Sequence, residues 1–295
     1  MRKQTGIPKI TGLSLIELMV SMVVALFLMG GVANIYFSTK SGDKIRSEIS
    51  EMEENARTAL VLMRSIISHA GYQSINDLEL DKPFYAEEED IPNPVCRSGT
   101  GKLVSYEPIL TKKTLNSVAG KRDTLVTINI ADSPTAAAGS GGLLIADCQA
   151  GIIPAECSSD PVEGLYTASE SRIYNYLYIN MPNGRRALTC MGSRGASQPL
   201  AENIENLQFL YGVSIGDDMV YRNAADVTAN DEWGSVVTVQ VGILVRSERE
   251  VLEVAESRVF LLLDEKITTP KDRRIYKAYT TTIVLPNRLD REFDS

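Results

Sequence analysis

The residues that most clearly point to chemistry lie in one segment near the N-terminus, Gly12-Leu13-Ser14-Leu15-Ile16-Glu17. Glu17 is the only charged residue in an apolar run from Leu13 to Phe37. A lone ionised side chain in hydrocarbon costs at least about 2.5–3.5 kcal/mol, so it is a candidate functional group that needs a partner. Cleavage after Gly12 would place the new α-amino group of Leu13 about one helical turn from Glu17. The segment therefore predicts a processing site and a carboxylate–amine pair, within one chain or between neighbours.

The apolar run must be a helix to position this pair. Its 25 residues would extend about 37 Å as an α-helix, enough to span a membrane. Arg2, Lys3 and Lys9 precede the run and no acidic residue does, which predicts a cytoplasmic N-terminus and an external C-terminal domain. A conventional signal peptide cut after Ala33 and a plain signal anchor are alternatives, but neither explains Gly12 and Glu17.

A second pattern extends the helix beyond the membrane. Apolar residues recur at helical spacing at Ile45, Ile49, Met52, Ala56, Ala59, Met63, Ile66 and Ala70. We expect the charged residues between them, Glu48 and Glu51 among them, to form a solvated face. Gly71 is a stop signal, with His69 in the last turn.

The Gly-Leu-Ser-Leu-Ile-Glu-Leu segment at 12–18 resembles the class III signal of type IV prepilins, although the usual first mature residue, Phe, is replaced by Leu13. The segments at 54–60, 70–72, 204–213 and 241–247 resemble the PilW family of type IV pilus minor pilins. The resemblance implies an α+β, type IV pilin-like fold, in which a long N-terminal α-helical spine precedes a β-rich, mostly antiparallel globular head. It implies a leader peptide at 1–12, a helix at 13–71 (transmembrane 13–37, amphipathic 38–71) and a periplasmic head at 72–295.

The same resemblance implies a role and partners. Prepilin peptidase would cleave after Gly12 and N-methylate Leu13, and Glu17 would act in assembly. The chain would be a single-pass protein of the bacterial inner membrane that helps to initiate pilus assembly in a minor-pilin complex, near the pilus tip. Its partners would be other minor pilins, the major pilin and the inner-membrane assembly platform. A type II secretion pseudopilin and a membrane-anchored adhesin or sensor are the alternatives, and the use of the pilus in twitching, adhesion or DNA uptake stays open.

Composition bounds the remaining possibilities. The chain of 295 residues has a net charge of −8, and loss of a leader with three positive charges makes it about −11, which disfavours nucleic-acid binding. The four cysteines, Cys96, Cys148, Cys157 and Cys190, predict disulfides in an oxidising compartment. Three pairings are possible, and we favour Cys148–Cys157 with Cys96–Cys190.

The external part is expected to be rich in strands. Strand-like segments occur at 103–110, 124–130, 143–148, 173–181, 237–245 and 275–285, and alternation is clearest in Val237–Val245. No catalytic constellation, cofactor motif or metal-ligand spacing is recognisable. Calcium binding by acidic residues in loops is a weaker alternative, which would use Asp217, Asp218, Asp226, Asp231 and Glu232.

Overall fold

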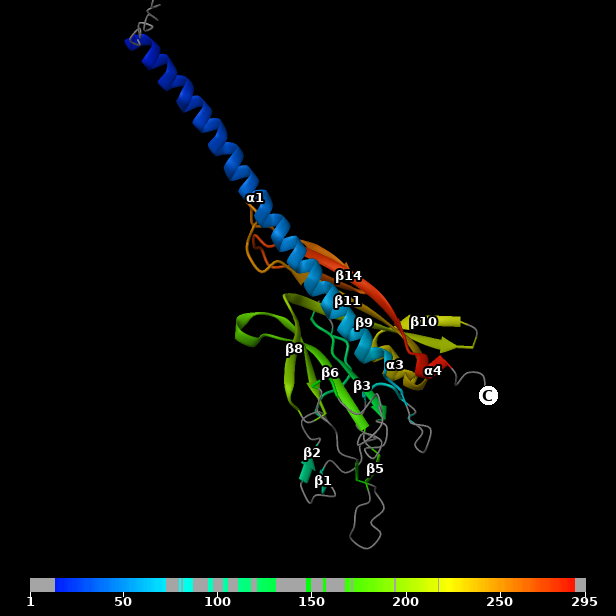
Figure 1. The fold of residues 1–295 in the computed structure, drawn as a ribbon. Helices are drawn as coiled ribbons and strands as arrows, with labels where there is room; N and C mark the ends of the chain where they lie inside the picture. The colour runs from blue at the N-terminus through cyan, green and yellow to red at the C-terminus, as the bar shows by residue number, and fades with distance from the viewer. Residues whose placement is uncertain are drawn as a thin grey trace, which may run out of the picture. The chain divides into compact units, whose positions relative to one another are not determined.

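The computed structural model describes residues 14–72, 80, 82–86, 95–97, 103–105, 111–117, 121–130, 147–149, 156–157, 168–170, 172–193, 195–216 and 218–289. Helix α1 spans Leu15–Ser68 and is followed by strands that pair antiparallel (Figure 1). The predicted order, a long N-terminal helix followed by antiparallel β-sheets, is confirmed. The chain divides into two compact units, residues 1–47 and 48–295.

In the second unit, helix α1 buries one stripe of side chains. Met52, Ala56, Ala59, Met63 and Ile67 are at most 2% exposed and belong to the main core. One prediction at the start of this stripe is wrong: Ile49 is 37% exposed while Glu48 is buried. Near its end, Ile66 packs half-buried against the core beside the fully buried Ile67. The next deeply buried residue after Met63 is Ile67, four residues further on, so the stripe stays on one face of the helix.

The larger core sheet has the strand order β10-β9-β11-β14 and is antiparallel throughout. Its strands are β9 (Ile204–Ile215), β10 (Asp218–Arg222), β11 (Val236–Arg246) and β14 (Tyr276–Val284). Alternate residues of β11, including Val239, Val241 and Ile243, face the same core as α1. Leu244 points to the other face, where it packs with Leu262, Ile267 and Tyr276. β11 is therefore buried on both faces, not on one as its alternation predicts.

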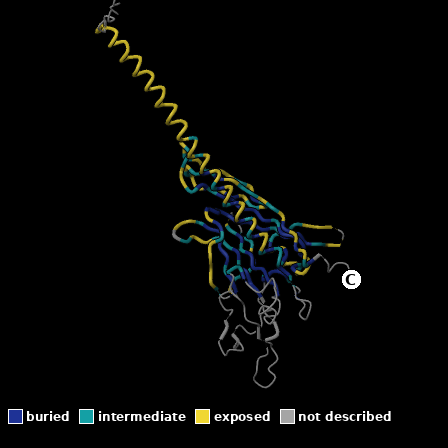
Figure 2. Tube along the Cα trace, viewed as in Figure 1, coloured by how far each residue is buried: buried dark blue, intermediate teal, exposed yellow. Residues whose placement is uncertain are grey.

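A second four-stranded sheet has the order β3-β6-β7-β8 and is also antiparallel. It consists of β3 (Leu125–Ile130), β6 (Arg172–Asn180), β7 (Ala187–Gly192) and β8 (Ser197–Glu202). Leu125, Leu177 and Leu188 join the main core, so both sheets and the second part of α1 share one apolar interior. Figure 2 shows this buried interior in dark blue, whereas the described residues from 14 to 41 are exposed.

Shorter elements complete the described chain. Strand pairs are β1 (Val95–Arg97) with β2 (Leu103–Ser105), β4 (Glu156–Cys157) with β5 (Ala168–Glu170), and β12 (Val259–Leu262) with β13 (Glu265–Thr268). The helical turns are η2 (Pro182–Gly184), α3 (Ala224–Ala229), η3 (Trp233–Ser235) and α4 (Pro286–Leu289).

The end of helix α1 follows the predicted stop signal. Gly71 adopts φ +74°, a left-handed conformation that glycine reaches without penalty. Its N–H donates to the carbonyl of Ile128 at 2.8 Å, which ties the end of the helix to β3. His69 Nδ1 lies 2.6 Å from the carbonyl oxygen of Ser65 and supplies a hydrogen bond in the last turn.

Candidate functional site

The predicted N-terminal site is described from Ser14 onward, and Gly12 and Leu13 lie outside the described residues. Ser14 precedes the first residue of α1, and its Oγ accepts the N–H of Glu17 at 3.3 Å. In return, Glu17 Oε2 accepts the N–H of Ser14 at 3.1 Å. This reciprocal pair is a capping box, which satisfies two backbone donors that the first helical turn otherwise leaves free.

The capping box gives Glu17 a local role that the sequence analysis missed. The signal was present, because Ser-x-x-Glu before an apolar run is the sequence pattern of such a box. The carboxylate is thus hydrogen-bonded at the helix N-terminus, where the helix dipole also favours a negative charge. Its side chain is held in place and still exposed, so it can meet a cation that approaches from outside the helix.

The surface that follows Glu17 is apolar all round. Large side chains from Leu15 to Phe37 are between 51% and 80% exposed. The helix is long and apolar enough to cross a membrane, and no residue in its most apolar stretch of 18 residues is buried. Such a surface is unfavourable in water, so it needs lipid or other apolar helices around it.

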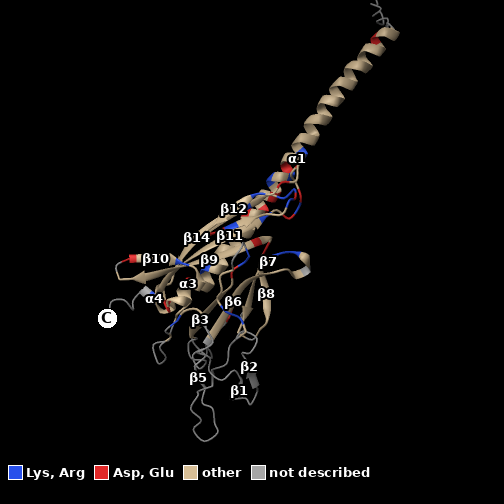
Figure 3. Cartoon of the chain, turned by 180° about the vertical axis from the view of Figure 1, so that it is seen from behind, with Lys and Arg blue, Asp and Glu red and all other residues tan. Residues whose placement is uncertain are grey.

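The electrostatics change in the head. Figure 3 shows residues coloured as Lys or Arg and as Asp or Glu along the second part of α1, whereas its long apolar first part carries almost none. Glu48 is only 2% exposed, and its carboxylate accepts the N–H of Arg249 at 2.9 Å and pairs with the Arg249 guanidinium at 3.1 Å. The expectation of a solvated Glu48 is therefore wrong, because the segment after β11 folds back over it. Burial raises the pKa of the neighbouring Glu51 carboxyl, and the charges of Glu248 and Glu48 raise it further.

A second buried carboxylate joins the two sheets. Glu205, at the start of β9, lies among the guanidinium groups of Arg122, Arg186 and Arg246. Arg122 precedes β3, Arg186 precedes β7, and Arg246 ends β11. Burial lowers the pKa of Arg186, and the charges of Arg122 and Arg246 lower it further. This cluster is a structural joint, in which one anion holds cations from three segments.

Asp123 makes a comparable joint just before β3. Its two carboxylate oxygens accept the backbone N–H groups of Ser117 at 2.6 Å and Phe209 at 2.9 Å. Burial raises the pKa of Asp123 to about 7, against the opposing effect of these two hydrogen bonds. The carboxyl thus links a loop to the central strand β9, in a place with little access to water.

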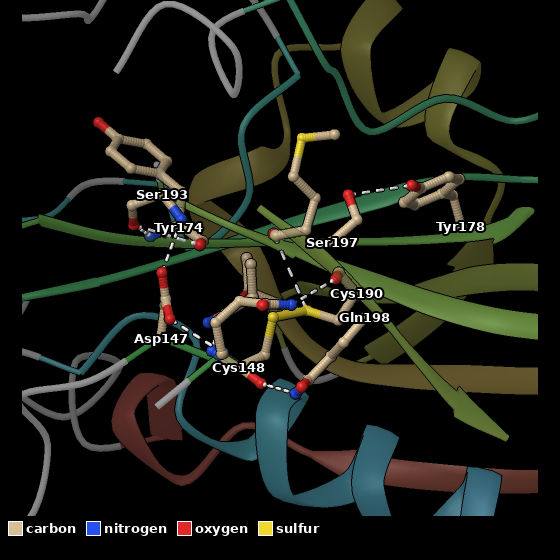
Figure 4. The surroundings of a disulfide bond; sticks show 12 residues. Asp147, Cys148, Tyr174, Tyr178, Cys190, Ser193, Ser197 and Gln198 are labelled. Atoms are coloured by element: carbon tan, nitrogen blue, oxygen red, sulfur yellow. Dashed lines mark hydrogen bonds between the residues drawn. A yellow bond between two sulfur atoms is a disulfide. The ribbon is translucent and has the colours of Figure 1, made fainter. Parts of the chain in front are cut away.

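The structure contradicts the favoured disulfide pairing. Cys148 is bonded to Cys190 on β7, with their Cα atoms 6.4 Å apart, a usual separation for a disulfide (Figure 4). Pairings of Cys148 with Cys157 and of Cys190 with Cys96 are therefore wrong. The side chains of Cys96 and Cys157 lie outside the described residues.

Hydrogen bonds from the second sheet explain this pairing. Cys148 N–H donates to Asn175 Oδ1 on β6 at 2.7 Å, and Ser193 N–H donates to Asp147 at 2.9 Å. These bonds hold the 147–149 segment against β6 and the end of β7. Proximity in the sequence favours Cys157 as the partner of Cys148, whereas the fold brings Cys190, 42 residues away on β7, into contact with it.

No metal centre is found among the described residues, where no group of three or more acidic, His or Cys side chains is suited to a metal ion. Asp217 lies outside the described residues. Of the other candidates for calcium, Asp231 pairs with Lys82 at 3.2 Å and Glu232 with Arg222 at 3.1 Å. These acids serve separate ion pairs.

Comparison with known proteins gives one family. Residues 177–287 match the PilW family, described as type IV pilus-assembly protein W. The match covers β7 to β14 and confirms the predicted PilW resemblance over that part of the chain. The match supports a relation to type IV pilus assembly.

Among solved structures, a type IV-like pilin, TTHA1219 from Thermus thermophilus, is similar over 83% of this chain and 96% of its own length. Its identity is 12% and its TM-score is 0.37. No curated protein matches the chain.

Proposed function

We propose that this PilW-like chain is a minor pilin that helps to initiate assembly of a type IV pilus, in a complex of minor pilins near the pilus tip. The observation that carries the proposal is a single helix with two different surfaces. Its first part is apolar on all sides and exposed, and its second part is packed into a folded head. Such a helix can anchor the head in a membrane and can later exchange lipid for the helices of neighbouring subunits.

The N-terminal residues would supply processing and register. Prepilin peptidase would cut after Gly12, remove the leader at 1–12 and N-methylate Leu13. The spine at 13–71 would then carry the periplasmic head at 72–295 from the inner membrane into the fibre. Glu17 would pair with the amine of a neighbouring subunit, which gives adjacent helices a fixed axial position.

The capping box supports this role for Glu17. The carboxylate already accepts one backbone N–H, so its negative charge is partly stabilised before any neighbour arrives. A carboxylate has two oxygens and can accept several hydrogen bonds, so an amine can be added to the cap without destroying it.

Purification from membranes tests the proposal. The tagged full chain is solubilised in mild detergent, its N-terminus is determined by mass spectrometry, and co-purifying proteins are identified. We expect a chain that begins at methylated Leu13 and that brings down other pilin-like subunits. Gly12→Glu should leave the leader in place. A wild-type chain that begins at Asn34, or that recovers no pilin-like subunit, would contradict the proposal. Recovery of type II secretion components alone would favour a pseudopilin.

A further inference from the structure

The exposed edge of β14 differs from the other edges of the two four-stranded sheets. Unpaired edge strands are usually short, charged, covered, or interrupted by proline or a bulge, because they otherwise attract other strands. β3 is covered, since Tyr85 donates to Val126 and Ile128 donates to Pro83. β8 contains Pro199, and the five-residue β10 has a charged residue at each end.

β14 has few of these protections, because its one charged residue, Lys277, is paired with Glu53 on α1. It has nine residues, its only charged residue is Lys277 near its start, and it contains no proline. Its pairing with β11 is regular from Tyr276 to Val284, without a bulge. Among the described residues, β11 is the only strand that pairs with it.

The register shows which backbone groups face outward. The N–H of Leu285 donates to Val237, and the carbonyl of Ile275 accepts from Ser247, so odd-numbered residues point toward β11. In an antiparallel ladder a residue turns both its N–H and its C=O to the same side, and successive residues alternate. Ala278, Thr280 and Thr282 therefore present their N–H and C=O groups at the open edge.

A groove runs beside this edge, between β14 and residues 53–64 of α1. Its volume is about 390 Å³, and its apolar lining includes Leu60, Val61 and the ring of Tyr279. Lys277 pairs with Glu53, and Arg64 donates to Thr281. The helix and β14 therefore run parallel to each other. A strand added to β14 would place every second side chain over this groove.

The charge of the groove indicates what those side chains should be. Glu53 is already neutralised by Lys277 at 2.9 Å. Arg57 and Arg64 also line the groove, and neither has a carboxylate within 4.0 Å among the described residues. They lie seven residues apart on α1, a rise of about 10.5 Å. On one face of a strand, two acids lie about 7 Å apart when adjacent and about 13–14 Å apart with one residue between them. The wider spacing exceeds the rise between the two arginines by about 3 Å, which long arginine side chains can bridge, and it leaves a place for an apolar residue over Val61, which lies between Arg57 and Arg64.

We infer that β14 accepts an extended segment of another pilin-like subunit by β-strand addition, with the pattern acidic-x-apolar-x-acidic facing the groove. This inference rests on the proposed function for the existence of that subunit. Main-chain hydrogen bonds to Ala278, Thr280 and Thr282 provide affinity, and the groove provides selectivity. The two acids meet Arg57 and Arg64, and the central apolar residue covers Val61.

The test blocks the outward edge while it preserves the ladder to β11. Thr280→Pro removes one outward N–H, a change that an edge strand tolerates because that group makes no bond within the sheet. Thr280→Ala retains the N–H and is the matched control. Each tagged full chain is purified from membranes, and the recovered pilin-like subunits are quantified by mass spectrometry. We expect about ten-fold lower recovery with Thr280→Pro, equivalent to about 1.4 kcal/mol, and unchanged recovery with Thr280→Ala.

A second variant tests the same surface without a change in β14. The double substitution Arg57→Glu and Arg64→Glu reverses the charge of the groove at exposed helix positions, and should also lower recovery. Glu54→Lys, at an exposed position outside the groove, is its control and should recover partners normally. Unchanged recovery with either the proline variant or the double variant overturns strand addition and leaves the proposed function intact. Failure of the wild-type chain to recover any pilin-like subunit counts against the proposed function itself.

Discussion

Three buried carboxylates hold the head together at points where loops meet strands. Glu48 binds Arg249 in the segment after β11, Asp123 links a loop to β9, and Glu205 lies among three arginines. A buried charge is costly unless it is paired or hydrogen-bonded, so each of these groups constrains the backbone that supplies its partners. Their role is to fix the positions of segments that are distant in the sequence.

Asp123 should make stability depend on pH. Its pKa is about 7 in the folded chain and 3.8 as the reference value, so the folded state binds the proton more tightly. Stability should therefore be highest below pH 4 as far as this group is concerned, and should fall as the pH rises toward 7. A difference of three pKa units corresponds to about 4 kcal/mol.

Asp123→Asn isolates this contribution. The amide is neutral at every pH but offers only one oxygen to the N–H groups of Ser117 and Phe209, so the variant should be less stable than wild type at pH 5. The difference in the free energy of unfolding between the two chains should be smaller at pH 8, where the wild-type carboxylate is charged. Urea unfolding followed by the fluorescence of Trp233, the only tryptophan and fully buried, measures both chains. A difference that is constant from pH 5 to pH 8 would contradict the assigned pKa.

At the scale of elements, the end of α1 depends on a close approach between two segments. A Cβ atom on Gly71 would lie 2.8 Å from Cδ of Arg288, which lies in α4. Arg288 Nη1 donates to the carbonyl of Leu80 at 3.0 Å, and Nη2 donates to that of Gly234. Gly71 therefore allows the helix to end and also leaves space for the arginine that ties these segments together.

Gly71→Ala should destabilise the head more than Gly184→Ala does. Both glycines have a positive φ, +74° and +76°, so both substitutions carry the same backbone strain of about 1–2 kcal/mol. Only Gly71 has a neighbour that must move, which should add about 1–3 kcal/mol. Urea midpoints of the two variants measure the difference. Equal losses would show that Arg288 moves aside freely.

At the scale of the whole molecule, Glu17 should matter for assembly and not for folding. Glu17→Ala removes the costly charge from an apolar segment and should leave membrane insertion and cleavage after Gly12 intact. The head should unfold at the wild-type urea concentration. Recovery of pilin-like partners and the number of surface pili should fall, because a partner amine without its carboxylate costs about 3–5 kcal/mol. Wild-type recovery and pilus number in this variant would show that the carboxylate does not dock subunits.

The sequence by itself was sufficient for features that depend on local spacing. The continuous helix, its stop at Gly71 and most of its buried stripe follow from a period of 3.6 residues, and the strand β11 follows from alternation. The PilW resemblance also depends on short segments. Even the capping box of Ser14 and Glu17 is a four-residue pattern that could have been found without the structure.

The tertiary structure decided the features that depend on which distant segments meet. The pairing of Cys148 with Cys190, the burial of Glu48 under Arg249 and the open edge of β14 all require the order of strands in the two sheets. Strand order is non-local: each strand carries only its own alternation, and many pairings would satisfy it. In the observed arrangement α1 and strands of both sheets share one core, and this shared burial is what the alternation of any single strand cannot specify.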